Sequence, residues 1–168
     1  MNGNHSSTVR DGPHLYALRV YYEDTDAGGI VYYANYLRFI ERARTEALRD
    51  MGIPHAQLVE QFHVMFVVRR VEMDYLRPAK LDDSLRIATQ AEEIGGASLV
   101  LRQTVMAEDG TPLAIAHVRL ACVSVGEERP KRIPPRWRVA LQSLRADSVP
   151  AESVTGANNT AFDLRSGL

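Results

Sequence analysis

One long stretch of apolar residues at helical spacing constrains the fold of this chain more than any other feature. Within residues 36–51, apolar side chains recur every three or four positions, which predicts one face of an amphipathic helix of about four turns. The stripe consists of Tyr36, Phe39, Ile40, Ala43, Ala47 and Met51. Gly52 and Pro54 follow, and both are typical of a helix end. A helix with a single apolar face must pack that face against another element.

The other periodic segments are strand candidates, most of them separated by short connections. They are rich in branched and aromatic residues, and they cover residues 15–22, 63–75, 85–92, 98–107 and 113–125. Gly95-Gly96 and residues 108–111 separate the last three and are typical of hairpin turns. Short turns join antiparallel strands. The pattern therefore predicts an α+β fold, in which the long helix lies on one face of a five-stranded antiparallel sheet.

The length of the chain, 168 residues, fits a single domain, because domains usually have about 100–200 residues. Short helices are expected over residues 54–60 and 134–144. We expect residues 1–13 to be a flexible N-terminus and residues 14–145 to be the folded domain. Residues 146–168 are rich in Ser, Thr, Asn and Gly, which favours a disordered tail.

Composition argues against several classes of protein. The formal net charge of −1 provides no basic field for nucleic acid. The N-terminus lacks the apolar segment of a secretory signal, and no stretch approaches the roughly 18 apolar residues of a membrane span, so we expect a cytoplasmic protein. The single cysteine, Cys122, lies in an apolar run and is interpreted as a small buried hydrophobic residue. The histidines have no metal-ligand spacing, so we expect no metal and no cofactor.

Residues that could perform chemistry concentrate in the turn before the long helix. Asp24 and Asp26 precede Gly28 and Gly29 there. A helix start presents unpaired N–H groups and a partial positive charge, and glycines let a ligand approach the backbone. A carboxylate beside such amides could attack a carbonyl or activate water while the amides hold the developing oxyanion. From the pattern alone, capping of a turn or helix is the commoner role for either aspartate.

Two segments resemble the signature of the 4-hydroxybenzoyl-CoA thioesterase family. They are residues 19–44 (RVYYEDTDAGGIVYYANYLRFIERAR) and residues 69–83 (RRVEMDYLRPAKLDD). The likeness extends over residues 15 to about 135, and the chain is most similar to the small acyl-CoA thioesterases encoded with the Tol-Pal envelope system. The resemblance implies a hotdog fold, in which a curved antiparallel sheet wraps the long helix. It also implies homodimers or homotetramers joined through sheet edges, with the acyl site at the dimer interface.

The resemblance also implies roles for individual residues. The catalytic aspartate is the one directly before the Ala-Gly element, here Asp26, and the oxyanion donor is the backbone N–H of Tyr33. Apart from the resemblance, the position of Tyr32 and Tyr33 next to the turn before the long helix makes them candidates to line an acyl pocket, and Gly29 is a candidate for close approach of the substrate to the backbone. Many Tol-Pal-associated relatives have histidine at the position of Tyr33, so a side-chain role of that histidine is not expected here. Asp26 would be a nucleophile or a general base, and the weak basicity of an aspartate slightly favours direct attack.

A group of basic residues near the C-terminus is a candidate site for the phosphates of coenzyme A. It comprises Arg129, Lys131, Arg132, Arg136, Arg138 and Arg145. Lys131 and Arg132 are the favoured phosphate contacts. The alternative is a solvated basic surface balanced by Glu127 and Glu128.

The sequence thus predicts an acyl-CoA thioesterase that releases free acid and CoA. A hydratase or dehydratase acting on acyl thioesters usually pairs histidine with a carboxylate, and residues 24–36 contain no histidine. A second alternative is a non-catalytic acyl-thioester-binding or scaffold protein that interacts with acyl carrier protein. Release of free thiol from acyl-CoA distinguishes the hydrolase from both alternatives. No pattern in the sequence specifies the acyl group.

Overall fold

The computed structural model describes residues 12–145 of the chain. Its elements are β1 (His14–Arg19), the short 3₁₀ helix η1 (Tyr22–Asp24), α1 (Asn35–Asp50), α2 (His55–Phe62), β2 (Val64–Tyr75), β3 (Ser84–Ile94), β4 (Ser98–Ala107), β5 (Pro112–Ser124) and α3 (Pro135–Gln142). Of the flexible N-terminus expected over residues 1–13, residues 1–11 lie outside these described residues, as does the whole of the disordered tail expected over residues 146–168.

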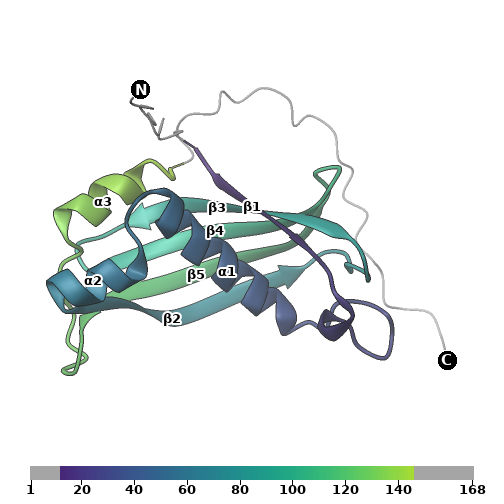
Figure 1. Ribbon diagram of the computed structural model, residues 1–168, viewed down its shortest axis with the longest axis horizontal. Helices are drawn as coiled ribbons and strands as arrows, with labels where there is room; N and C mark the ends of the chain where they lie inside the picture. Colours follow the sequence, from purple (N-terminus) through teal and green to yellow (C-terminus); the bar gives the residue numbers. More distant parts are fainter. Residues whose placement is uncertain (1–11, 146–168) are drawn as a thin grey trace, which may run out of the picture.

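The five strands form one antiparallel sheet in the order β1-β3-β4-β5-β2 (Figure 1). β3, β4 and β5 are neighbours both in sequence and in the sheet, as the hairpin signals predict. β2 pairs along nearly all of β5, from Val64 opposite Ser124 to Tyr75 opposite Ala114. Among the described residues, the outer edge of β2 has no strand partner, so a row of backbone donors and acceptors is open there.

α1 crosses one face of this sheet and packs mainly against β1 and β3 (Figure 1). The predicted apolar stripe is confirmed, because five of its six residues are buried and Met51 packs partly buried against the same core. The buried members are Tyr36, Phe39, Ile40, Ala43 and Ala47.

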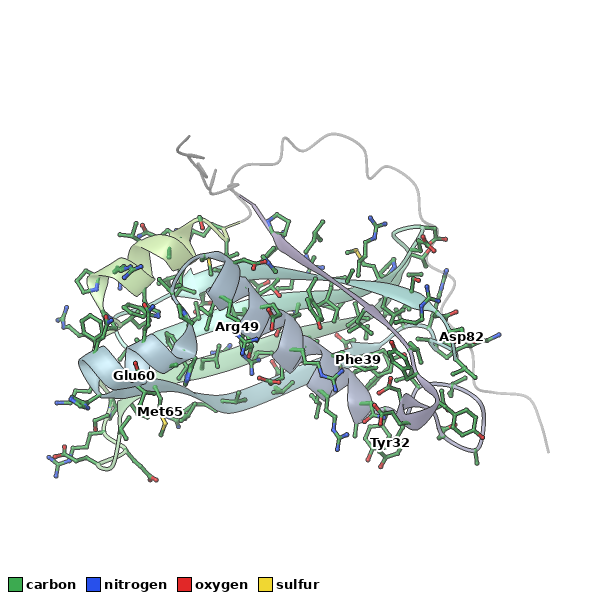
Figure 2. All side chains as sticks on the ribbon, viewed as in Figure 1. Tyr32, Phe39, Arg49, Glu60, Met65 and Asp82 are labelled. Atoms are coloured by element: carbon green, nitrogen blue, oxygen red, sulfur yellow. The ribbon has the colours of Figure 1, made fainter. Side chains whose placement is uncertain are left out.

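The two short helices cover the end of the sheet that lies near the C-terminus of α1. α2 contacts β2 and α3 contacts β3, and the ring of Phe62 meets the fully buried ring of Trp137 edge to face. Tyr32 lies at the opposite end of the molecule from Glu60 and Met65 (Figure 2). None of the helices in the described range has the length and apolar character needed to cross a bilayer.

The first strand ends earlier than its composition indicates. Strand β1 stops at Arg19 instead of Tyr22, because Tyr22 begins η1. The carboxylate of Asp24 accepts a hydrogen bond from the Tyr21 N–H at 2.9 Å, which caps this short helix. Side-chain capping therefore turns the chain away from the sheet just before the candidate site.

Candidate active site

The turn before α1 is closed by backbone hydrogen bonds and carries the Asp26 side chain on its surface. The Asp26 N–H donates to the Ile30 carbonyl at 2.9 Å, and the Gly29 N–H donates to the Asp26 carbonyl at 3.0 Å. Gly29 has φ +73°, a backbone conformation that favours glycine. A bridge between Thr25 and Val31 closes the base of the turn. The turn is therefore well defined, while the Asp26 side chain is exposed.

The Asp26 carboxylate is oriented through one of its two oxygens. Oδ1 accepts a hydrogen bond from the Gly28 N–H at 2.7 Å. A Cβ at position 28 would lie 3.1 Å from this oxygen, so glycine leaves room for the carboxylate to fold back onto the turn. Within the described residues Oδ2 has no hydrogen-bond partner. It is available to a carbonyl carbon or a water molecule.

Asp24, in contrast, has the structural role that the sequence left open for both aspartates. It is buried, and its carboxylate is engaged by the Tyr21 N–H. Its carbonyl accepts hydrogen bonds from the Tyr32 N–H and from the Asn35 side-chain amide, each at 2.9 Å. Asp24 therefore ties the turn to the start of α1, and Asp26 is the exposed carboxylate of the pair.

Unpaired amides lie at the start of α1. The helix begins at Asn35 with Ala34 as its N-cap, and no side chain caps it. The Tyr32 N–H is used by Asp24, whereas the Tyr33 N–H has no acceptor within residues 12–145. Such donors at the positive end of a helix attract negative charge. The structure thus has an exposed carboxylate on the turn, at Asp26, and free amide donors directly after the turn, at the start of α1.

Tyrosine rings surround this helix start. The ring centroid of Tyr33 lies 4.8 Å from that of Tyr32 and 6.3 Å from that of Tyr75, and the Tyr75 hydroxyl donates to the Tyr33 carbonyl at 3.0 Å. The hydroxyl of the buried Tyr36 accepts a hydrogen bond from the Ala79 N–H at 3.0 Å. Burial raises the pKa of both Tyr36 and Tyr75, so both phenols are neutral at neutral pH.

A cavity of about 310 Å³ lies beside these rings. Its wall consists of Ile30, Val31, Tyr33, Tyr36, Tyr75 and residues 76–78. Asp26 is on the same turn as Ile30 but does not itself line the cavity. A group bound in this cavity would therefore contact Tyr33, while Asp26 lies on the turn that begins the same segment.

Lys131 and Arg132 do not approach this site within one chain. The Lys131 N–H donates to the Cys122 carbonyl near the end of β5, whereas Leu76, in the wall of the cavity, donates to the Leu113 carbonyl near the start of β5. From Leu113 to Cys122 a strand extends roughly 30 Å. The two candidate regions therefore lie at opposite ends of the sheet (Figure 1).

Two of the other basic residues have structural roles. Arg138 donates to the Gly95 carbonyl at 2.6 Å, and Arg136 donates to the Gly52 carbonyl at 2.9 Å. Lys131 and Arg132 are exposed, and neither forms an ion pair within the part of the chain described. These two side chains are therefore free to meet an anion.

Within residues 12–145, neither the cysteine thiol nor a cluster of metal ligands offers an alternative centre. Cys122 is buried, as the sequence indicates, and burial raises the pKa of its thiol, which makes the nucleophilic thiolate scarce. Across residues 12–145, no three His, Cys, Asp or Glu side chains lie close enough together to hold a metal ion.

One residue with a possible binding role was missed from the sequence. Arg44 lines a second cavity between α1, α2, β2 and α3. The sequence contains a signal for it, because Arg44 follows Ile40 by four positions and precedes Leu48 by four. Residues at this spacing share a helix face, so an arginine occupies a position on the edge of the apolar stripe.

Comparison with known proteins agrees with this architecture. The family model described as the thioesterase-like superfamily matches residues 20–141. The acyl-CoA thioesterase YbgC of Haemophilus influenzae is 42% identical over 135 residues, which is 80% of this chain and 98% of that protein.

Solved structures share the fold. A probable thioesterase from Bartonella henselae has a TM-score of 0.69 at 36% identity, covering 73% of this chain and 100% of that chain. Slr0204, a 1,4-dihydroxy-2-naphthoyl-CoA thioesterase from Synechocystis, has a TM-score of 0.72 at 21% identity, covering 77% of this chain and 96% of that chain. The predicted hotdog fold is thereby confirmed. The chain belongs to the thioesterase-like superfamily, in the same family as the YbgC acyl-CoA thioesterases.

Proposed function

We propose that this protein hydrolyses the thioester of an acyl-CoA to a free acid and CoA. The observation that carries the proposal is the exposed Asp26 carboxylate, held on a closed turn that leads into the unpaired amides at the start of α1. The activity named for the Haemophilus influenzae relative supports the same reaction class.

In the proposed mechanism, the thioester carbonyl accepts a hydrogen bond from the Tyr33 N–H. Negative charge grows on this oxygen as the carbonyl carbon becomes tetrahedral, so the hydrogen bond and the positive end of α1 stabilise the transition state more than the substrate. One such donor typically contributes about 2.7–4 kcal/mol.

Asp26 provides the negatively charged oxygen in one of two ways. As a nucleophile, it forms an anhydride with the acyl group and expels the CoA thiolate, and water then hydrolyses the anhydride. As a general base, it takes a proton from the water that attacks the carbonyl. Either route consumes one water and yields one acid and one thiol. The free Oδ2 suits both routes, and direct attack is slightly favoured because a carboxylate is a weak base.

The groups beside the reacting atoms would position the acyl portion. The cavity next to Tyr33 has walls of aromatic and aliphatic side chains, which suit an apolar acyl group. Tyr32 is half-exposed, its ring lies beside that of Tyr33, and it could cover the thioester. Gly29 has no side chain, so it leaves room at the turn. Its own N–H is already bonded to the Asp26 carbonyl.

The open edge of β2 supports a homodimer. Val68, Val71 and Tyr75 on this strand are 49%, 37% and 48% exposed, and a strand edge with exposed apolar side chains favours pairing with another chain. Two copies related by a two-fold axis would pair β2 with β2 in antiparallel orientation. The Val64 end of each strand would then lie beside the Tyr75 end of its partner.

This pairing would also bring the loop after β5, which carries Lys131 and Arg132, to the candidate active site of the partner. The Val125 N–H donates to the His63 carbonyl at 2.8 Å, so the loop after β5 lies at the Val64 end of β2. In the dimer, Lys131 and Arg132 of one copy would approach the Asp26 end of the other. They would contact the phosphates of coenzyme A there, because long basic side chains bind phosphate well.

The test is thiol release from a panel of short-chain, long-chain and aromatic acyl-CoAs. We expect wild-type protein to release CoA from at least one of them. Asp26→Asn should keep the fold and lose several orders of magnitude in kcat. Glu23→Gln, an equal charge change at an exposed position in the adjacent η1, should keep wild-type turnover.

Undiminished turnover in Asp26→Asn would remove Asp26 from the mechanism. No thiol release from any substrate would favour the non-catalytic binding or scaffold protein, with acyl carrier protein as its partner.

A further inference from the structure

The Tyr33 amide, which is proposed to hold the oxyanion, lies in a short turn with few fixed points. The Tyr32 N–H donates to the Asp24 carbonyl at 2.9 Å, and the Asn35 N–H donates to the Tyr32 carbonyl at 2.8 Å. Because a peptide unit is planar and trans, the second of these bonds also directs the Tyr33 N–H on the opposite side of the same unit. No side chain caps α1 where this turn ends, and helix ends fray. The direction of the amide therefore depends on what else holds the turn.

Tyr75 holds this turn from the side of the sheet. It is the last residue of β2, and its hydroxyl donates to the Tyr33 carbonyl at 3.0 Å. Its ring also meets the rings of Tyr33 and Tyr36 edge to face, with centroids 6.3 Å and 5.5 Å away. Burial raises the pKa of Tyr75, so the phenol keeps the proton that it donates. Within residues 12–145, no backbone N–H reaches the Tyr33 carbonyl, so the hydroxyl of Tyr75 is what fixes it there.

We propose that Tyr75 is a positioning residue for the reaction. Its hydroxyl ties the uncapped turn before α1 to the sheet and so keeps the Tyr33 N–H directed at the thioester oxygen. The inference rests on the proposed hydrolysis and adds a residue that acts through Tyr33 instead of on the reacting atoms. An oxyanion donor is effective because it is preorganised, and a misplacement of about 1 Å at a catalytic group can cost about a hundredfold in rate.

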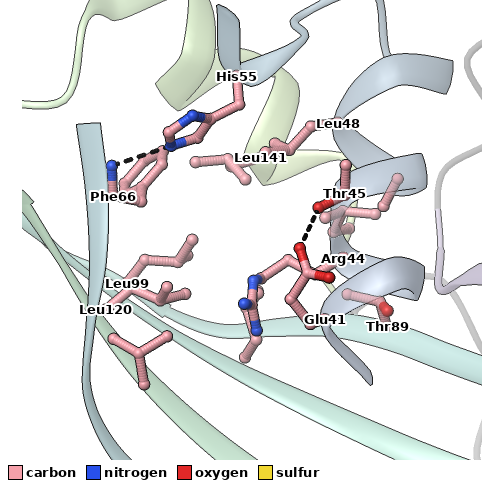
Figure 3. Close-up of a pocket in the computed structure, with 14 residues that line it drawn as sticks. Glu41, Arg44, Thr45, Leu48, His55, Phe66, Thr89, Leu99, Leu120 and Leu141 are labelled. Carbon is pink, nitrogen blue, oxygen red and sulfur yellow. Dashed lines mark hydrogen bonds between the residues drawn. The ribbon is translucent and has the colours of Figure 1, made fainter. Parts of the chain in front are cut away.

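Removal of the hydroxyl alone separates this role from contact with the substrate. In Tyr75→Phe the ring remains in the wall of the cavity beside Tyr33, so the surface offered to an acyl group changes little. The second cavity, which Arg44 lines, meets β2 at Phe66 and Val68 (Figure 3). Val68 lies well before Tyr75 in the strand, at a distance of roughly 20 Å. The substitution should therefore lower kcat and leave KM unchanged.

The first experiment observes the Tyr33 amide directly and does not depend on turnover. In protein labelled with ¹⁵N-tyrosine, the Tyr33→Phe variant identifies the Tyr33 signal by its loss. Relaxation measurements on wild type should give this amide the order parameter of a rigid backbone, about 0.85, and Tyr75→Phe should lower it towards about 0.6. Tyr16→Phe is the matched control, because it removes the same hydroxyl from a partly buried ring on β1 and should leave the Tyr33 order parameter unchanged.

The second experiment measures kcat and KM by thiol release, with the acyl-CoA that wild-type protein hydrolyses fastest. Tyr75→Phe should lower kcat by about tenfold to a hundredfold without a change in KM, and Tyr16→Phe should match wild type. The thioether of the same acyl-CoA, in which a methylene group replaces the carbonyl, should bind wild type and Tyr75→Phe with equal affinity and stoichiometry in calorimetry. Equal stoichiometry would show that the lower kcat does not come from unfolded protein.

The possible results separate this proposal from the hydrolase proposal. A Tyr33 order parameter that is equal in wild type and Tyr75→Phe would overturn the role of Tyr75, and so would an unchanged kcat in that variant. Weaker thioether binding by Tyr75→Phe would also overturn it, because the side chain would then contribute to substrate binding or to the fold. Failure of wild type to release thiol from any acyl-CoA would instead refute the hydrolysis on which this role depends, whatever the order parameter of Tyr33.

Discussion

Two aspartates two positions apart have opposite environments in this protein, and that difference organises the candidate site. Asp24 is 7% exposed and its carboxylate is bonded to the Tyr21 N–H. Asp26 is exposed and keeps one oxygen free. The sequence indicates that one of them caps a turn, but it does not say which, because both precede glycines and a helix. Only the path of η1 decides that the first side chain points inward.

Replacement of Asp24 should therefore affect stability, in contrast to replacement of Asp26. Asp24→Ala leaves the Tyr21 N–H without its acceptor, and an unmet hydrogen bond of this kind costs about 1–3 kcal/mol of unfolding free energy. Asp24→Asn retains an oxygen acceptor and should cost less. Chemical denaturation of both variants, with Asp26→Ala as the exposed comparison, measures the difference. Equal losses in Asp24→Ala and Asp26→Ala would contradict the assigned capping role.

At the scale of elements, the sequence predicted the type and order of the five strands and three main helices. Hydrophobic period explains this success, since the stripe from Tyr36 to Met51 repeats at helical spacing and the strand candidates lie between turn signals. Arg44 was missed because one charged residue within a strong apolar period is easily counted with the polar face. The distance between Asp26 and Lys131 was also inaccessible, because it depends on the direction of β5 through the sheet.

The contact between α2 and β2 should make stability sensitive to pH. His55 begins α2, and its Nε2 accepts the Phe66 N–H of β2. Burial, followed by the charge of Arg44, lowers the pKa of His55 in the folded protein, while the unfolded chain keeps an ordinary value of about 6.5. As pH falls below that value, the unfolded state takes up the proton first, so stability decreases until the folded-state pKa is passed.

We expect the Tm of wild-type protein to fall between pH 7.5 and pH 5.5 more than that of His55→Gln. Glutamine can still offer an oxygen to the Phe66 N–H but does not titrate in this range. Thermal unfolding of both proteins at the two pH values isolates the contribution of His55, because all other titrating groups are shared. Parallel decreases in both proteins would show that His55 is not responsible.

At the scale of the whole molecule, one chain contains both halves of a possible CoA site but keeps them apart. The Asp26 turn and the loop with Lys131 and Arg132 lie at opposite ends of a sheet whose longest open edge is β2. Antiparallel pairing of two β2 strands exchanges these ends between copies. In such a dimer, each proposed site would take its carboxylate from one chain and its phosphate contacts from the other.

A mixed dimer can show whether the basic residues act across the two chains. Asp26→Asn homodimers should lose turnover, and Lys131→Glu/Arg132→Glu homodimers should have a raised KM for acyl-CoA. A heterodimer of these two chains, purified through different affinity tags, should contain one intact site and recover roughly half the wild-type kcat with a wild-type KM. Recovery follows because the Asp26 of the second chain faces the Lys131 and Arg132 of the first.

The outcome differs clearly if each chain supplies its own phosphate contacts. The only Asp26 in the heterodimer would then belong to the chain with reversed charges, so the raised KM would persist. An acyl pantetheine, which lacks the nucleotide phosphates, serves as the control substrate. Its KM should be equal in wild-type protein and in the Lys131→Glu/Arg132→Glu homodimer, because the charge reversal acts on phosphates and not on the acyl cavity near Tyr33. A KM raised equally for both substrates would instead place the effect of the reversal in the fold or the dimer.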